Sequence, residues 1–141
     1  HDPRYPAQPL PHHHDLILSP VALPAAALLK AVEAVVQDQL DAYNARDLAR
    51  FVAVYSQGVR LYRPPASEPF VVGKAALAEL YATQHFILPG LHAELVNRRV
   101  FGNKVIDHER IRGVLEQSFD VAAVYEVIDG LICNAWLYAA E

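Results

Sequence analysis

The stretch Leu91–Gly113, LHAELVNRRVFGNKVIDHERIRG, decides the fold because it predicts two strands joined by a tight turn. At its centre, Gly102 and Asn103 tolerate the positive φ angles that a two-residue hairpin loop requires. The register of the two strands follows by counting outward from this loop. The predicted pairs are Phe101 with Lys104, Val100 with Val105, Arg99 with Ile106, Arg98 with Asp107, Asn97 with His108 and Leu95 with Arg110.

The second strand of this hairpin carries charged side chains on both of its faces. Because side chains alternate along a strand, Asp107 and Glu109 share one face. His108, Arg110 and Arg112 share the other. Neither face is therefore simple core. We expect one face to meet water or a polar partner and the other to line a cavity.

Length and composition predict a single globular domain. The chain has 141 residues, of which 53% are hydrophobic and 20% are charged, and this length suits one compact core. A net charge of -4 and a pI near 5.9 argue against a nucleic-acid partner. No apolar run is long enough to span a membrane, and the single Cys133 is compatible with a reducing compartment. We therefore expect a cytoplasmic protein.

Residues 1–20 predict a proline-punctuated arm, and residues 21–141 predict the domain. The prolines of the arm favour extended backbone over helix. The arm also contains His12, His13, His14 and Asp15, whose side chains are of the kind that bind metal ions. A tract of this type lacks a closed ligand shell, so we predict neither a metal site nor a cofactor.

Three helices are predicted ahead of the hairpin. Apolar residues recur at spacings of three and four over residues 28–43. Asp47 is placed to cap a second helix that Gly58 closes. The run KAALAELYATQHF after Gly73 predicts a third helix. Between the second and third helices, residues 59–63 predict a short strand.

A second hairpin follows, with its turn at Asp129 and Gly130. Its two strands and those of the first hairpin make a four-stranded antiparallel meander. Helices first and strands last predict an α+β domain, with the helices packed on one face of a curved antiparallel sheet. The counted pairs of the second hairpin are Ile128 with Leu131, Glu126 with Cys133, Val124 with Ala135 and Ala122 with Leu137, and its opposite face carries Tyr125, Asn134, Trp136 and Tyr138.

Four strings of the sequence resemble a known family in their order and spacing. They are LDAYNARDLARFVAVY, SEPFVVGKAALAELY, LPGLHAELVNRRVFGNKVIDHERIRG and AAVYEVIDGLI, and they resemble the SnoaL-like and ketosteroid-isomerase-like branch of the NTF2-like superfamily. The resemblance covers about residues 28 to 140. It implies a cone-shaped fold in which three N-terminal helices close one side of a bent sheet around a deep apolar pocket, commonly as a homodimer.

The groups that carry out ketosteroid isomerisation are not retained at the positions that the resemblance implies. In those enzymes an Asp moves the proton, while a Tyr and a protonated carboxylic acid hold the enolate oxygen. The corresponding positions here are Arg63, Gln39 and Val124. Because a guanidinium stays charged at any usable pH, Arg63 cannot act as a base. We therefore expect no steroid isomerase activity of that kind.

Two other branches of the superfamily match the chain in part. Limonene epoxide hydrolases use an Asp, Arg and Asp set, of which the resemblance retains Arg110 and replaces the two Asp residues with Arg112 and Leu137. SnoaL-type cyclases close rings with a carboxylate and a His in the pocket. Three candidates for these groups lie, by the counted register, on the same face as the retained Arg110. They are His108, Asp120 and Glu126.

The counted register and the retained Arg together assign the faces of the sheet. The convex face is predicted to carry Arg98, Asp107 and Glu109. The concave face, which lines the pocket, is predicted to carry Asn97, His108 and Arg110. On the outer face we also place Tyr125, Trp136 and Tyr138, whose large rings favour a homodimer through that face.

The first hypothesis for function is a cofactor-independent isomerase- or cyclase-type enzyme that acts by proton transfer on an apolar small molecule. In it, His108 is the acid/base because histidine titrates near neutral pH, Arg110 stabilises the anion, and Asp120 supplies a carboxylate. The second hypothesis is a non-catalytic module for ligand binding or dimerisation, in which the polar residues are structural. The predicted binding residues are Gln39, Tyr43, Tyr55, Tyr62, Leu95, Asn97, Val124, Glu126 and Leu137.

Overall fold

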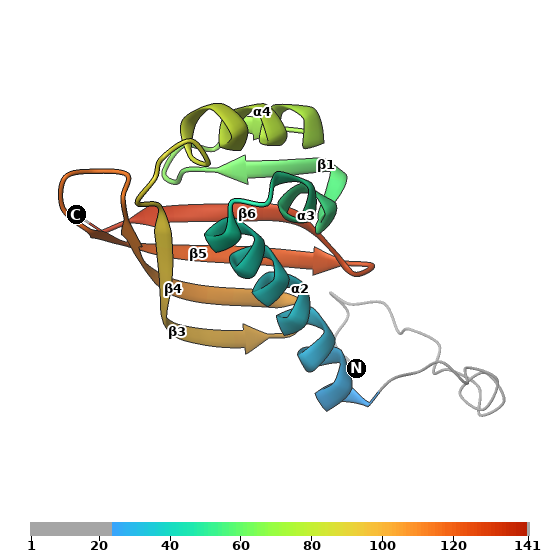
Figure 1. Ribbon diagram of the computed structural model, residues 1–141. Helices are drawn as coiled ribbons and strands as arrows, with labels where there is room; N and C mark the ends of the chain where they lie inside the picture. The colour runs from blue at the N-terminus through green and yellow to red at the C-terminus, as the bar shows by residue number, and fades with distance from the viewer. Residues whose placement is uncertain (1–23, 141) are drawn as a thin grey trace, which may run out of the picture.

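The computed structural model describes residues 24–140, which fold into a six-stranded sheet and three helices (Figure 1). The helices are α2 (Ala25–Ala45), α3 (Leu48–Ala53) and α4 (Lys74–Gln84). The strands are β1 (Tyr55–Tyr62), β2 (Val71–Val72), β3 (His92–Phe101), β4 (Lys104–Arg112), β5 (Phe119–Ile128) and β6 (Leu131–Ala139). The predicted arm of residues 1–20, with its histidines, lies outside the described residues.

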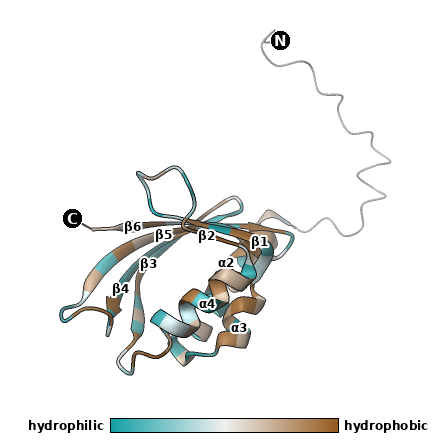
Figure 2. Ribbon diagram, turned by 90° about the horizontal axis from the view of Figure 1, so that it is seen from above, coloured by the Kyte–Doolittle hydropathy of each residue, from teal (hydrophilic) through white to brown (hydrophobic). Residues whose placement is uncertain are grey.

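The sheet is mixed, and the helices cover one of its faces. Its strand order is β2-β1-β6-β5-β4-β3, and β1 runs parallel to β6 while all other neighbours are antiparallel. Figure 2 shows α2, α3 and α4 on the same side of the curved strands. The predicted α+β class and the meander of β3 to β6 are confirmed. The expectation of a purely antiparallel sheet is wrong, because β1 pairs with the distant β6 and such a pairing leaves no pattern in the sequence.

Local signals set the ends of the first two helices. Arg46 follows α2 with a φ of 52°, and its guanidinium donates to three backbone carbonyls in the loop 88–91. Asp47 accepts a hydrogen bond from the Arg50 backbone N–H at 3.1 Å and caps α3 as predicted. α3 is shorter than predicted because β1 already begins at Tyr55. The Arg46 contacts hold the segment between α4 and β3 against the end of α2.

The register of the first hairpin agrees with the count from Gly102 and Asn103 over most of its length. The five predicted pairs nearest the turn are confirmed, out to Asn97 with His108. The sixth is wrong, because a bulge between Leu95 and Asn97 inserts one extra residue in β3. Leu95 therefore lies opposite Glu109 rather than opposite Arg110.

The second hairpin contains a similar irregularity close to its turn. Ile128 pairs with Leu131 as predicted, and the register then shifts between Glu126 and Val127. The three remaining predicted pairs are displaced by one residue for this reason. The observed pairs are Glu126 with Asn134, Val124 with Trp136 and Ala122 with Tyr138.

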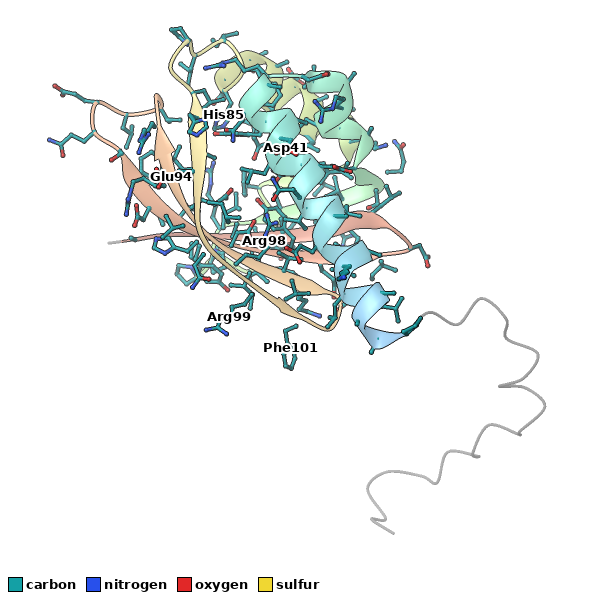
Figure 3. All side chains as sticks on the ribbon, turned by 60° about the horizontal axis from the view of Figure 1, so that its bottom comes forward. Asp41, His85, Glu94, Arg98, Arg99 and Phe101 are labelled. Atoms are coloured by element: carbon teal, nitrogen blue, oxygen red, sulfur yellow. The ribbon has the colours of Figure 1, made fainter. Side chains whose placement is uncertain are left out.

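The predicted assignment of the two sheet faces is wrong. Asp107 and Glu109 are buried on the helix-covered face, with exposed fractions of 0% and 6%, whereas His108 and Arg110 alternate with them and lie on the opposite face. Figure 3 shows the same alternation on the neighbouring strand, where Arg98 points beneath α2. Burying two carboxylates costs free energy unless opposite charges or hydrogen bonds compensate for it. The sequence pattern alone does not reveal such compensation.

The physical reason for the correct face lies at the two ends of β4. Val105 and Ile111 are buried and share their face with the two buried carboxylates. On the other face, Ile106 is 40% exposed. The face with two buried apolar side chains packs against the helices, and the face with one exposed apolar side chain does not.

Aromatic side chains fill the space between the helices and the covered face. Phe51 of α3 lies at the centre, with ring centroids 4.6 Å from Tyr81 of α4, 5.1 Å from Tyr55 of β1 and 6.2 Å from Tyr43 of α2. Each of these rings is buried. This cluster joins three helices to the sheet and closes one end of the space that remains open beside it.

No helix in residues 24–140 combines the length and the apolar character that crossing a bilayer requires.

Candidate functional site

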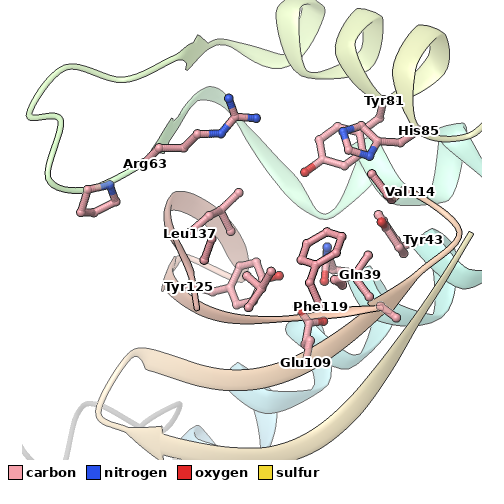
Figure 4. A pocket seen from close by; sticks show the side chains of 15 residues that line it. Gln39, Tyr43, Arg63, Tyr81, His85, Glu109, Val114, Phe119, Tyr125 and Leu137 are labelled. Carbon is pink, nitrogen blue, oxygen red and sulfur yellow. The ribbon is translucent and has the colours of Figure 1, made fainter. Parts of the chain in front are cut away.

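A cavity of about 360 Å³ lies between the helices and the covered face of the sheet (Figure 4). This volume lies in the range of small-molecule sites, roughly 300–1,000 Å³. Its apolar lining residues include Ile111, Val114, Phe119, Val121 and Leu137. Its polar lining residues are Gln39, Tyr43, Arg63, Tyr81, His85, Glu109 and Tyr125.

Among residues 24–140, Glu109 is the one carboxylate that lines this cavity. β4 places it on the covered face, two residues after Asp107. Burial raises the pKa of Glu109 to about 7, the charge of Asp107 adds to the rise, and the charge of Arg98 partly offsets it. At neutral pH this carboxyl group therefore exists in both its protonated and its charged form, which is the condition for donating and accepting protons.

Asp107 is held in a different way from Glu109. Arg98 donates two hydrogen bonds to its carboxylate, from Nε to Oδ1 at 2.7 Å and from Nη2 to Oδ2 at 2.9 Å. The Nη1 of Arg98 donates to Gln37 Oε1 of α2 at 2.8 Å. This buried, bidentate pair anchors β3 and β4 to α2, so its role in the fold is structural.

The tyrosines of the cavity are hydrogen-bond donors. Burial raises the pKa of Tyr43, Tyr81 and Tyr125, to about 12 for Tyr81. Their hydroxyl groups therefore stay protonated across the physiological range. Glu109 contributes to the rise in each case because its negative charge disfavours a phenolate nearby. A carboxyl group surrounded by phenol donors can serve both proton transfer and the stabilisation of an oxyanion.

Two buried polar atoms around the cavity have no hydrogen-bond partner among the described residues. They are Gln39 Oε1 and His85 Nδ1. Gln39 also lowers the pKa of Tyr55 through a hydrogen bond, which offsets part of the larger rise caused by burial. Native proteins leave few buried polar atoms unpaired. The two atoms therefore mark places where a bound molecule can supply hydrogen-bonding groups.

The mouth of the cavity carries a cation and an imidazole. The Arg63 guanidinium carbon lies 3.9 Å from the centre of the Phe70 ring. His85 stacks on Tyr81, with 4.7 Å between ring centroids. Burial and the charge of Arg63 lower the pKa of His85, so its ring is neutral at pH 7. Figure 4 shows the Arg63 guanidinium pointing across the opening, toward Tyr81 and His85.

The pattern of the SnoaL-like domain matches residues 36–135, which include the whole first β-hairpin, the second as far as Ala135 in β6, and most of the residues that line the cavity. The chain belongs to the SnoaL-like domain family. This confirms the resemblance that the sequence strings indicate. No curated protein sequence matches this SnoaL-like domain.

Solved structures share the fold of this SnoaL-like domain at low sequence identity. A candidate ketosteroid isomerase from Kribbella flavida DSM 17836 has a TM-score of 0.69 at 19% identity, covering 79% of each chain. A SnoaL-like protein of unknown function from Burkholderia thailandensis has a TM-score of 0.67 at 18% identity, covering 79% of this chain and 96% of the other. An LEH-like epoxide hydrolase from M. tuberculosis has a TM-score of 0.66 at 17% identity, covering 79% and 84%. These similarities show the fold alone.

The three predicted catalytic residues of the SnoaL-like domain come together, but on the outer face of the sheet. His108 Nε2 lies 2.8 Å from Asp120 Oδ2, and Arg110 Nε donates to Asp120 Oδ1 at 3.0 Å. These hydrogen bonds, that of Arg110 above all, lower the pKa of Asp120. None of the three side chains lines the cavity. The match of Arg110 to the hydrolase set fails for the same reason, because its side chain faces away from the pocket.

The predicted binding residues of the SnoaL-like domain divide between the two faces. Gln39, Tyr43 and Leu137 line the cavity, and the buried Tyr55 contacts Gln39. Leu95 packs against the core without lining the cavity. The four others lie on the outer face of the sheet, the face that carries His108, and therefore do not line the cavity. They are Tyr62, Asn97, Val124 and Glu126.

Six polar or aromatic residues that line the cavity were not predicted as site residues, and one of them is Arg63. Tyr125, expected on the outer face, lies inside because the bulge near Glu126 separates its face from that of Trp136. The parity that Glu109 shares with Ile111 would have placed it inside as well. The other missed residues are Tyr81, His85 and Phe119.

Within residues 24–140, no group of three or more His, Cys, Asp or Glu side chains is arranged to hold a metal ion.

Proposed function

We propose that this SnoaL-like domain is a cofactor-independent enzyme that moves a proton on an apolar small molecule, with Glu109 as the acid/base. The observation that carries the proposal is the position of Glu109, a carboxyl group 6% exposed that lines an otherwise largely apolar cavity. A buried carboxyl group with a pKa of about 7 is suited to both halves of a proton transfer at neutral pH. This role replaces the one that the sequence suggests for His108.

The proposed reaction begins with a substrate whose carbonyl group lies beside the tyrosines. The Glu109 carboxylate takes a proton from the carbon next to the carbonyl, and the electron pair of the C–H bond moves onto the carbonyl oxygen as an enolate. A hydroxyl group of Tyr43, Tyr81 or Tyr125 donates a hydrogen bond to that oxygen. If the substrate carries a C=C bond beside that carbon, the enolate is a dienolate, and protonated Glu109 returns the proton to its far (γ) carbon; the double bond shifts into conjugation with the carbonyl, which is an isomerisation. In a cyclase-type reaction the enolate carbon instead attacks a second carbonyl of the same molecule, whose oxygen takes the proton.

The apolar wall supports this assignment because it excludes water from the carboxylate. Phe119, Val121 and Leu137 come from β5 and β6 and line the cavity, and Figure 4 shows Phe119 next to Glu109. In such surroundings the carboxylate is a stronger base than in water. The same wall suits the apolar substrate that the sequence predicts.

The test is hydrogen exchange on an apolar ketone. The protein is incubated with 2-tetralone in D₂O, and loss of the α-proton signal is followed by NMR. We expect exchange above the buffer rate, and we expect Glu109→Gln to reduce the protein-dependent rate by roughly 10²-fold or more. Glu126→Gln, the same substitution on the outer face, and His108→Ala should leave the rate unchanged.

Two results would contradict the proposal. Exchange that survives Glu109→Gln would remove Glu109 from the reaction. Binding of the ketone without exchange would instead favour the second hypothesis, a non-catalytic ligand-binding module, for which the unpartnered Gln39 Oε1 supplies a contact.

A further inference from the structure

We propose that the cavity selects substrates that carry a carboxylate group, and that Arg63 at the cavity mouth binds this group. The inference deepens the proposed function, on which it rests, by naming the chemical class of the substrate. It is carried by the charge, the orientation and the surroundings of Arg63.

Of the residues that the structure describes, Arg63 is the one permanently charged cation that lines the cavity. The ion pairs formed among residues 24–140 use other basic side chains, Arg98, Lys104, His108, Arg110 and Arg112. In this part of the chain, Arg63 forms none. Its side chain is exposed and directed across the opening of the cavity. A bound molecule can therefore reach this positive charge.

Phe70 orients the Arg63 guanidinium without using its hydrogen-bond donors. The guanidinium carbon lies 3.9 Å from the centre of the Phe70 ring. Stacking on an aromatic face leaves the N–H groups, which lie in the guanidinium plane, free at its edge. A carboxylate matches two of these donors at once. Because the contact with Phe70 restricts the Arg63 side chain before a ligand binds, less side-chain freedom is lost on binding.

His85 supplies a second polar contact beside Arg63. Its buried Nδ1 has no partner among the described residues, and its ring stacks on Tyr81. Since the ring is neutral, it does not add a second positive charge to the mouth. One permanent cation and one neutral imidazole fit a group with a single negative charge.

The rest of the cavity argues for a carboxylate rather than a phosphate. A phosphate monoester carries about -1.5 to -2 charges at pH 7 and three acceptor oxygens, for which Arg63 alone is a poor match. Glu109 lies in the same cavity and disfavours additional negative charge. The ligand is therefore an apolar body, in contact with Phe119, Val121 and Leu137, with one carboxylate at the mouth.

The test compares a carboxylate with a neutral molecule of the same shape. The probes are 2-naphthoate and 2-acetylnaphthalene, in which a methyl ketone replaces the carboxylate. Isothermal titration calorimetry measures both dissociation constants at low salt. We expect 2-naphthoate to bind about tenfold more tightly, with the preference shrinking as NaCl is added.

Variants at two arginines of the same segment assign the preference to Arg63. Arg63→Gln should abolish it, and Arg63→Lys should retain part of it, because lysine keeps the charge and loses the planar fork. Arg60→Gln is the matched control. Arg60 is also exposed, but it lies opposite Asn134 in the strand register, on the outer face of the sheet. It should leave both dissociation constants unchanged.

Glu109→Gln separates this inference from the proposed function. That variant should lose proton exchange and still prefer 2-naphthoate. Equal affinity for the two probes, no binding of 2-naphthoate, or a preference that survives Arg63→Gln would overturn the inference. If exchange depends on Glu109 while the anion preference is absent, the proposed function stands and the assignment of Arg63 falls.

Discussion

Asp107 and Glu109 lie two residues apart on the same covered face of β4, but Arg98 binds the first while the second faces the cavity. The two carboxylates therefore have different roles in one short strand. The charge of Asp107 makes it harder to charge Glu109, and the charge of Arg98 acts in the opposite direction. The structural pair thus tunes the pKa of the candidate catalytic group.

The first prediction concerns this tuning. Asp107→Asn removes the negative charge that raises the pKa of Glu109 and leaves the opposing charge of Arg98 in place, so the pKa of Glu109 should fall. The measurement is a ¹³C NMR titration of the Glu109 carboxyl carbon. Asp129→Asn, in the β5–β6 turn, should leave that pKa unchanged, and asparagine tolerates the φ of 52° found there.

The same variant should also lower stability, because it leaves Arg98 buried with a neutral partner. Breaking a buried ion pair by changing one partner typically costs about 3–5 kcal/mol. Replacing both residues, as in Arg98→Met with Asp107→Leu, should recover much of that loss. A Glu109 pKa that stays near 7 in Asp107→Asn would show that the charge of Asp107 does not raise it.

The second prediction is a pH dependence of stability that comes from Glu109. Its pKa is raised from 4.5 in the unfolded chain to about 7 in the folded protein, so the folded state binds more protons between these values. The stabilising contribution is complete below about pH 4.5 and is lost as the pH rises through 7. The full change is about 3 kcal/mol at roughly 1.4 kcal/mol per pKa unit.

Urea unfolding at a series of pH values checks this prediction. Glu109→Gln should remove the decline in stability between pH 4.5 and 7, because glutamine does not titrate. Glu94→Gln is the control and should retain the decline. Glu94 is a partly exposed carboxylate of β3 that pairs with Arg112 of β4. The same slope in wild type and Glu109→Gln would place the titrating group elsewhere.

The hairpins show how far a sequence pattern predicts this fold. Counting from Gly102 and Asn103 gives the register of β3 and β4, because a two-residue turn leaves no freedom near it. The count fails beyond Asn97, where a bulge adds one residue. A bulge changes which side chains share a face without changing the apolar and polar pattern around it. The second hairpin fails in the same way near Glu126.

The candidate site was harder to predict than the fold, for two reasons. The charges on β4 suggested that the face of His108 lines the cavity, although Val105 and Ile111 show that the opposite face is buried. Tyr81 and His85 reach the cavity because α4 packs beside β1 and β2. That placement depends on the pairing of β1 with β6, which is non-local and has no signature in the sequence.

The third prediction is a homodimer through the outer face of the sheet. On this face Tyr62 stacks on Trp136, with 5.6 Å between ring centroids, and Ile106 and Tyr138 are 40% and 44% exposed. Apolar and aromatic side chains gathered on an uncovered sheet face favour association with a second copy. Light scattering at micromolar concentration should give a mass of about twice 15.6 kDa.

A charge placed on that face should separate the subunits. Ile106→Glu should shift the mass to that of a monomer, since an unpaired carboxylate in an apolar interface is unfavourable. Ile87→Glu is the matched control, because Ile87 is 67% exposed and follows α4, away from this face. A wild-type protein that is monomeric, or a dimer unaffected by Ile106→Glu, would contradict the prediction.

The fourth prediction uses two glycines with similar backbones and different surroundings. Gly113 and Gly102 have φ angles of 84° and 61°. A Cβ at Gly113 would lie 2.2 Å from the backbone of Gly90, whereas a Cβ at Gly102 would meet nothing within 4 Å. Alanine at either position strains the backbone by about 1–2 kcal/mol. At Gly113 the steric clash adds to that cost.

Urea unfolding should therefore show a clearly larger loss for Gly113→Ala than for Gly102→Ala. Because the clashing atoms belong to backbone, the segment around Gly90 and Leu91 must shift to make room. Val114, the next residue, lines the cavity, so Gly113→Ala should also weaken binding of 2-naphthoate while Gly102→Ala leaves it unchanged. Equal losses in the two variants would mean that the contact between Gly113 and Gly90 does not hold the loop at the cavity mouth.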